Sequence, residues 1–137
     1  MTEIASLFPT PLKGTWPAVP DSISQIRAAH LRFAADAGAT RRTADAVALA
    51  VSEAAANAVI HAFGDGLPAG RVTTTAELFG DDVLRCVICD DGRGMASDHE
   101  SSGLGLGLAL IAQMAERVQI HSAPGAGTEL CMDFRLP

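Results

Sequence analysis

The spacing of apolar residues predicts a first helix over residues 21–37. Apolar side chains recur there every three or four positions, as on the buried face of an amphipathic helix. Asp21 is expected to cap its N-terminus, and Gly38 is a natural stop, because glycine readily adopts the left-handed conformation that ends many helices. The apolar positions are Ile23, Ile26, Ala29 or His30, Phe33 and Ala37.

A second, longer helix is predicted over residues 41–63, a stretch that is rich in alanine and contains neither glycine nor proline. Thr40 offers the N-cap, and a glycine cluster that starts at Gly64 ends the helix. The apolar positions form a stripe that fits one face packed on a core. They are Val47, Val51, Ala55, Ala58, Val59 and Ala62.

Beyond the second helix the pattern becomes typical of strands. Residues 72–79 and 83–89 are rich in apolar and β-branched side chains, and Gly80-Asp81-Asp82 separates them, which predicts an antiparallel hairpin. A glycine-rich loop is expected over residues 90–105, and a helix over residues 106–117.

A second strand pair is predicted over residues 118–122 and 128–136, around Pro124-Gly125-Ala126-Gly127. Before the first helix the prolines leave room for a short edge strand at most, near residues 3–8. This order of elements predicts an α+β two-layer sandwich, in which helices cover one face of a mixed, mostly antiparallel sheet.

Composition and charge narrow the class of protein. A chain of 137 residues is expected to form one domain, and 48% hydrophobic with 19% charged residues is not the profile of a disordered or fibrous chain. The net charge is −6 and no basic run is longer than Arg41-Arg42, so we expect no nucleic-acid partner. Polar residues interrupt the apolar runs and the N-terminus does not resemble a signal peptide, so we expect no membrane partner. Three cysteines then predict reduced thiols and a cytoplasmic location.

A polar line crosses the second predicted helix. Glu53, Asn57 and His61 are spaced four residues apart, so a helix projects all three from nearly one side. Such a line can be a solvated helix face. Alanines occupy the neighbouring positions here, where a solvated face usually carries Lys or Glu, and this favours the wall of a pocket.

Two glycine-containing motifs follow the first hairpin. The first is Asp90-Asp91-Gly92-Arg93-Gly94, at the end of a predicted strand. Its carboxylate can accept a hydrogen bond from an exocyclic amino group, and its glycines let a flat ligand approach the backbone. An ordinary acidic turn is the alternative. Gly103-Leu104-Gly105-Leu106-Gly107 leads into a helix, where bare N–H groups can cradle phosphate oxygens; a flexible linker is the alternative.

In this order the motifs resemble those of a known family. Glu53-Ala-Ala-Ala-Asn57, Asp90-x-Gly92-x-Gly94 and Gly103-x-Gly105-x-Gly107 resemble the N, G1 and G2 boxes of the GHKL ATPase family, and Gly127-Thr128 resembles its closing Gly-Thr. The resemblance spans about residues 40–135 and implies a Bergerat-type ATP-binding fold. The amino-acid sequence of residues 50–62 resembles that of the single-domain serine-protein kinases that act as bacterial anti-sigma factors.

The resemblance implies a role for each motif residue. Glu53 would be the general base for an incoming hydroxyl, and Asn57 would give its side-chain oxygen to Mg²⁺. Asp90 would accept from the adenine amino group, with Thr128 nearby. The remaining positions that would hold ATP are Gly92 and Gly94 against the ring and Gly103, Leu104, Gly105, Leu106 and Gly107 around the phosphates.

The implied protein transfers the γ-phosphate of ATP to a serine or threonine of an antagonist (anti-anti-sigma) protein, sequesters a sigma factor and forms a homodimer. The loop between Gly94 and Gly103 is short, and its charged members are Asp98 and Glu100, whereas lids in the family often bring a basic group to the γ-phosphate. An alternative therefore stays open, a nucleotide-gated partner-switching module without kinase activity.

Other candidate sites have simpler interpretations. Cys86 and Cys89 form a Cys-x-x-Cys string on a predicted strand, where they point to opposite faces and are not expected to share a metal. Arg27 and Arg32 on the first helix are interpreted as solvated charges, although an anti-sigma factor would make that helix a reasonable docking place.

Overall fold

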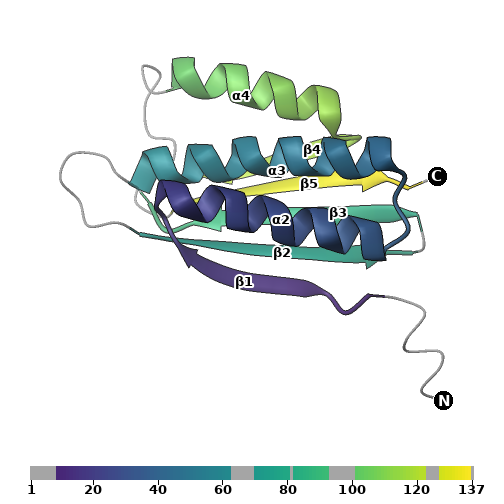
Figure 1. Ribbon diagram of the computed structural model, residues 1–137. Helices are drawn as coiled ribbons and strands as arrows, with labels where there is room; N and C mark the ends of the chain where they lie inside the picture. The colour runs from purple at the N-terminus through teal and green to yellow at the C-terminus, as the bar shows by residue number, and fades with distance from the viewer. Residues whose placement is uncertain (1–8, 63–69, 81, 93–100, 123–126, 137) are drawn as a thin grey trace.

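The computed structural model of the protein describes residues 9–62, 70–80, 82–92, 101–122 and 127–136. These residues form three helices and five strands, whose arrangement is shown in Figure 1. In chain order they are β1 (Leu12–Pro17), α2 (Pro20–Asp36), α3 (Arg41–Ala62), β2 (Arg71–Phe79), β3 (Val83–Asp90), α4 (Ser101–Met114), β4 (Arg117–Ser122) and β5 (Thr128–Arg135).

The strands form one sheet in the order β1-β2-β3-β5-β4, and every neighbouring pair is antiparallel. All three helices lie on the same face of this sheet, as Figure 1 shows, and no helix in the described ranges covers the other face. The predicted two-layer α+β sandwich is confirmed. The sheet is more uniform than the predicted mixed sheet, since no parallel pair occurs among the described strands.

Alternation along the strands separates the two faces of the sheet. In β3, Leu84, Cys86 and Ile88 are buried beneath the helices, while Arg85 and Cys89 lie half-buried on the open face. Cys86 and Cys89 therefore point to opposite faces, as predicted, and the cysteines at 86, 89 and 131 are all free thiols.

The central helix is α3, which packs against both other helices and against the sheet. Its buried face consists of small side chains, so the neighbouring elements approach it closely. Its buried members are Ala44, Val47, Ala50, Val51, Ala54, Ala55, Ala58 and Val59. The stretch Arg41–Ile60 is long and apolar enough to cross a membrane, but half of it is buried inside the protein, as in the core helix of a globular domain.

The first two helices agree with the sequence pattern, apart from one cap. α2 begins at Pro20 instead of being capped by Asp21, because proline suits the first helical turn, and Asp21 lies within that turn. Gly38, with φ of 87°, ends α2 as predicted. At the start of α3 the hydroxyl of Thr40 accepts a hydrogen bond from the N–H of Thr43 at 3.2 Å, which confirms the predicted N-cap.

Two other boundaries differ from the prediction. The predicted N-terminal strand near residues 3–8 lies outside the described residues, and the edge strand of the described part is β1 instead, which pairs with β2 despite the prolines that bound it. An edge strand tolerates those prolines, because one of its sides needs no ladder bonds. α4 begins at Ser101 and ends at Met114, so it lies earlier at both ends than predicted. It ends early because the N–H of Glu116 donates a hydrogen bond to the carbonyl of Asp133 at 2.8 Å, and the chain pairs with β5 from this point.

One ionisable side chain is enclosed in the core without a partner. His30 of α2 is 1% exposed, and neither of its ring nitrogens has a hydrogen-bond partner among the described residues. Burial disfavours the charged imidazolium and lowers the pKa of His30 to about 4 from its usual 6.5. The folded protein therefore holds this imidazole neutral.

We predict that His30 makes the fold sensitive to acid. Because its folded pKa lies below the unfolded one, its contribution to the free energy of unfolding is fully present above pH 6.5 and is lost as the pH falls towards 4, by up to about 3 kcal/mol. Urea titrations between pH 4 and pH 7 measure this loss. His30→Leu keeps the volume and should flatten that part of the pH profile; an unchanged profile in this variant would contradict the prediction.

Candidate nucleotide-binding site

The elements that carry the predicted motifs meet at one end of the molecule. In Figure 1 the C-terminal ends of α3 and β3 lie at the same end as the starts of α4 and β5. The antiparallel register explains part of this, because the last residue of β3, Asp90, pairs with the first residue of β5, Thr128. Motifs far apart in sequence thus become neighbours.

Glu53 and Asn57 lie one turn apart on α3, and both are half-buried. The neighbouring alanines of α3 enter the core, among them Ala54, Ala55 and Ala58. Side chains on a fully solvated helix face would be exposed. The half-burial of Glu53 and Asn57 therefore favours a position in the wall of a pocket over a solvated face. The side chain of His61, the third member of the polar line, lies outside the described part of the structure.

Gly107 of α4 lies against this pair of polar side chains. A Cβ atom added to Gly107 would stand 3.3 Å from Oε2 of Glu53 and 3.3 Å from Nδ2 of Asn57, which is tighter than nine in ten real Cβ contacts. The absence of a side chain at Gly107 lets α4 approach α3 at this point. The structure therefore brings one residue of the predicted G2 motif onto both residues of the N motif.

The amide of Asn57 is the most informative polar group at this contact. Its Nδ2 atom is buried and has no hydrogen-bond partner among the described residues. Leaving a buried polar group unpaired costs about 1–3 kcal/mol, so such an atom in a candidate site indicates a polar ligand. The same amide offers an oxygen, the ligand type that Mg²⁺ prefers. The residues present fit a hydrated Mg²⁺ that accompanies phosphate groups.

Asp90 stands at the other side of the site, at the end of β3. By alternation it shares the helix-covered side of the sheet with Ile88 and Cys86. Its Oδ1 atom accepts a hydrogen bond from the N–H of Gly92 at 2.9 Å, which orients the carboxylate. A carboxylate only accepts hydrogen bonds and offers about four acceptor positions, so Asp90 is the type of side chain that suits a ligand amino group.

Gly127 allows β5 to pass closely beside Asp90. Its φ is 78°, in the left-handed region, and an added Cβ would collide with the main-chain oxygen of Asp90. The next residue, Thr128, pairs with Ser122 of β4 on its other side, and their hydroxyl oxygens lie 3.1 Å apart. The Ser122 hydroxyl also donates to the carbonyl of Gly127 at 3.4 Å.

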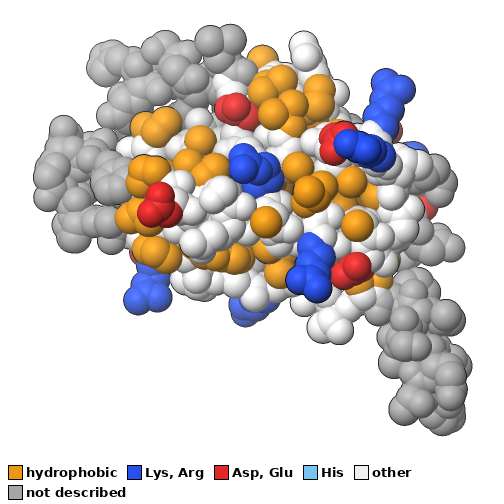
Figure 2. Space-filling view, in the orientation of Figure 1, with side chains coloured by type: hydrophobic (Ala, Val, Ile, Leu, Met, Phe, Trp, Pro, Cys, Tyr) orange, Lys and Arg blue, Asp and Glu red, His pale blue; other side chains and the backbone are white. Residues whose placement is uncertain are grey.

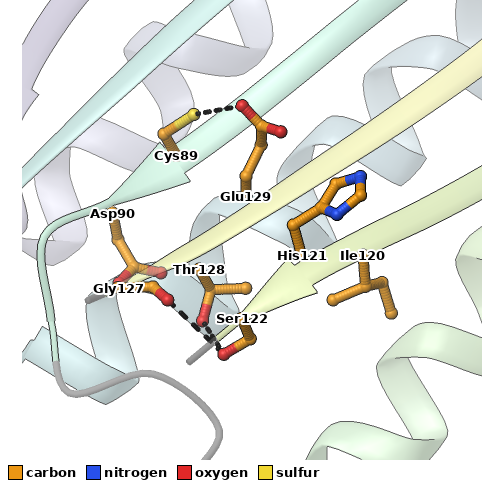
Figure 3. A pocket seen from close by; sticks show the side chains of 8 residues that line it. All are labelled: Cys89, Asp90, Ile120, His121, Ser122, Gly127, Thr128 and Glu129. Atoms are coloured by element: carbon orange, nitrogen blue, oxygen red, sulfur yellow. Dashed lines mark hydrogen bonds between the residues drawn. The ribbon is translucent and has the colours of Figure 1, made fainter. Parts of the chain in front are cut away.

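A cavity of about 640 Å³ opens at these strand ends (Figure 3). This volume lies within the range of small-molecule sites. Its polar groups include the Asp90 carboxylate and the Ser122 and Thr128 hydroxyls, which can hydrogen-bond the edge of a flat heterocycle. The cavity is lined by Cys89, Asp90, Ile120, His121, Ser122, Gly127, Thr128 and Glu129.

The predicted phosphate loop differs from the expectation. α4 starts at Ser101, so Gly103, Leu104 and Gly105 lie inside a helix instead of in a loop before it. Glycine weakens a helix without forbidding it, and the segment contains no proline. Only the first four N–H groups of a helix lack an intrahelical partner, so those of Gly103 and Leu104 are not used within α4, whereas those of Gly105, Leu106 and Gly107 are. Gly94 lies outside the described residues.

Two features of the cavity were missed by the sequence analysis. Ser122 carried no motif signal; only its register opposite Thr128, across the predicted turn, could have indicated it. A row of Cys89, Glu129 and His121 crosses three strands on the open face of the sheet (Figure 3). Partial burial, together with the neighbouring Glu129 carboxylate 3.8 Å from its sulfur, raises the pKa of Cys89 to about 11, so this thiol stays protonated and unreactive at neutral pH.

Comparison with known proteins agrees with this geometry. Residues 16–134 match the histidine kinase-like ATPase domain family, so the chain belongs to that family. The serine-protein kinase RsbW of Staphylococcus epidermidis is 31% identical over 124 residues, which cover 80% of this chain and 77% of the relative. The anti-sigma F factor of Clostridium acetobutylicum is 28% identical over 113 residues, which cover 73% of this chain and 76% of the relative.

Solved structures give the same result. The crystal structure of the RsbU and RsbW domains of a Mycobacterium tuberculosis protein matches with a TM-score of 0.74 and 26% identity over 93% of this chain. The chain spans 33% of that longer protein. A mycobacterial sensor histidine kinase, MprB, matches with a TM-score of 0.55 at 17% identity, which shows a shared fold. The protein is therefore a histidine kinase-like ATPase domain whose relatives include anti-sigma factors and serine-protein kinases, and such relatives imply ATP binding.

We predict that Gly107→Ala separates nucleotide binding from stability. The added methyl group crowds Glu53 and Asn57, so the affinity for ADP should fall at least about tenfold, while the better helix propensity of alanine should keep or raise the melting temperature. Isothermal titration calorimetry and thermal unfolding measure the two quantities. Ala109→Ser, at an exposed position of the same helix, is the control. Unchanged ADP affinity in a folded Gly107→Ala protein would contradict the prediction.

Proposed function

We propose that this protein binds Mg-ATP and transfers its γ-phosphate to a serine or threonine of an antagonist protein, and that it sequesters a sigma factor when the antagonist is absent. The observation that carries this proposal is the meeting of Glu53, Asn57 and Gly107 at the contact between α3 and α4. The Glu53 carboxylate and the Asn57 amide, whose buried nitrogen has no partner among the described residues, lie beside a position of α4 without a side chain and offer a base and a metal ligand in one place.

The proposed roles follow from the chemistry of these groups. Glu53 accepts the proton of the attacking hydroxyl, because a carboxylate can take up a proton and act as a general base. Asn57 would hold Mg²⁺ through its amide oxygen, and the bound ion would neutralise charge on the phosphates. Asp90 and Thr128 bind the adenine edge in the cavity at the strand ends. Gly103 and Leu104 offer their N–H groups to the phosphates.

The partners are proposed from the relatives and from the resemblance. Two curated relatives are named as an anti-sigma factor and a serine-protein kinase, and most of each is covered by this chain. We therefore propose an antagonist protein and a sigma factor as partners, a homodimer as the assembly and the cytoplasm as the location. Neither nucleic acid nor a membrane is among the proposed partners, in keeping with the net charge of −6.

A second candidate function has one observation in its favour. The sequence between Gly94 and Gly103, which corresponds to the lid in the resembled family, contains no lysine or arginine to meet a γ-phosphate. Phosphoryl transfer usually relies on such a cation to stabilise the transition state. A nucleotide-gated binding module, whose affinity for its partners depends on ATP or ADP occupancy, needs no such group.

We predict that Glu53→Gln abolishes phosphoryl transfer and keeps nucleotide binding. Glutamine preserves size and hydrogen bonding but does not accept the proton, so transfer should fall about 10²-fold or more. Soluble protein from the source cells, incubated with the chain and γ-labelled ATP, provides the acceptor, and labelled phosphoserine is measured. Ser52→Ala, at the adjacent position on α3, is the control.

The outcomes distinguish the two functions. Label in the wild-type reaction and none with Glu53→Gln supports the kinase. If wild-type protein binds ATP but transfers no label, and its affinity for a partner differs between ATP and ADP, the switching module is correct. Undiminished transfer by Glu53→Gln would overturn the base role.

We further predict that Asp90 selects adenine over guanine. A carboxylate only accepts hydrogen bonds and so suits the adenine amino group, whereas an amide can also donate to the guanine oxygen. Asp90→Asn should weaken ADP binding about tenfold and reduce the preference for ADP over GDP. Competition titrations with both nucleotides measure this, with Asp36→Asn as an exposed control. Equal losses for ADP and GDP would argue against direct readout of the base.

A further inference from the structure

Two aspartates follow one another at the end of β3, and the structure gives them different surroundings. Asp90 ends the strand and faces the helix-covered side of the sheet. Asp91 is exposed, and its Oδ1 atom accepts a hydrogen bond from the main-chain N–H of Arg71 at 2.8 Å. Asp91 therefore contacts the first residue of β2, which lies on the side of Asp90 away from β5.

This bond extends the contact between β2 and β3 by one residue beyond their last main-chain pair. The ladder between β2 and β3 ends at Val72 and Asp90. The next N–H along β2 belongs to Arg71, and the carboxylate of Asp91 accepts its hydrogen bond in place of a strand carbonyl. The residue directly after Asp90 is thus fixed to β2 by a charge-assisted hydrogen bond, which is stronger than a neutral one.

Gly70 provides the space for this bond. A Cβ atom added to Gly70 would collide with Oδ1 of Asp91. The main chain of Gly70 is fixed on its other side, because its carbonyl accepts from the N–H of Ala18 at 2.8 Å. Any side chain at position 70 would therefore have to push the Asp91 carboxylate away from Arg71.

Asp90 is consequently enclosed from two directions. On the β5 side, Gly127 lies so close to the Asp90 carbonyl that no side chain fits. On the β2 side, the Asp91 carboxylate joins the following residue to Arg71. A ligand-binding carboxylate gains affinity when its backbone is held in place before the ligand arrives, since less conformational entropy is lost on binding.

We propose that Asp91 is a positioning residue for nucleotide binding, which acts through its hydrogen bond to Arg71 and, with the space left by Gly70, holds Asp90 in its binding orientation. This inference rests on the proposed function, because it takes Asp90 to contact the adenine ring.

The test is a double-substitution cycle with ADP as the probe. Asp91→Ala and Gly70→Ala each remove the bond to Arg71 and should each weaken ADP binding about tenfold, as measured by calorimetry. In the double variant the added methyl group has no carboxylate to displace, so the loss should equal that of Asp91→Ala alone rather than the product of both. Asp91→Asn keeps the acceptor oxygen and should bind ADP within about twofold of wild type.

Two further measurements separate positioning from general stability. Hydrogen exchange of the Arg71 amide should accelerate in Asp91→Ala and Gly70→Ala but not in Asp91→Asn, while the melting temperature without nucleotide should change little. Asp36→Ala removes an exposed charge elsewhere and serves as the matched control.

The outcomes are distinct. If wild-type protein does not bind ADP, the proposed function fails and this inference fails with it. If wild-type protein binds ADP and Asp91→Ala binds equally well, the inference alone is overturned. Multiplicative losses in the double variant, or a loss in Asp91→Asn as large as in Asp91→Ala, would also overturn it, because they would show that the hydrogen bond is not the cause.

Discussion

The close approach of α4 to α3 is the contact on which the site depends. It is possible because Gly107 has no side chain where Glu53 and Asn57 lie. The small side chains of α3 also let the neighbouring elements approach its other faces closely; Val47, Ala50 and Ala54 are buried there in the core. A core helix with bulkier residues would hold the layers further apart. The polar pair would then face solvent rather than a neighbouring helix.

Because the helices cover one face of the sheet, the polar residues of the candidate site lie at the strand ends. All described helices cover the same face, so residues that alternate towards that face either enter the core or, at a strand end, border the cavity. Asp90 and Thr128 are of the second kind, since each sits at the end of a strand whose other helix-facing positions are buried. The fold thus places polar groups at its edge, where water or a ligand can reach them, rather than in its core.

The open face of the sheet has a different character. Arg85 forms a two-pronged ion pair with Asp133, with oxygens 2.7 and 3.0 Å from its nitrogens, and its guanidinium lies 4.3 Å from the centre of the Phe79 ring. The bond to Asp133 raises the pKa of Arg85 and keeps it charged. Paired charges and half-buried thiols therefore occupy this face, and Figure 2 shows further charged side chains among apolar ones on the helix side.

The amino-acid sequence alone determined the elements other than β1, the two layers and the family, because periodicity, caps and glycine spacing are local properties of the chain. The cap at Thr40, the stop at Gly38 and the split of Cys86 from Cys89 are of this kind. Only the tertiary structure decided that β1 pairs at residues 12–17, that α4 starts at Ser101, and that Asp91 bonds to Arg71. These three features depend on contacts between residues far apart in sequence. A local sequence pattern does not predict the free energy of such contacts.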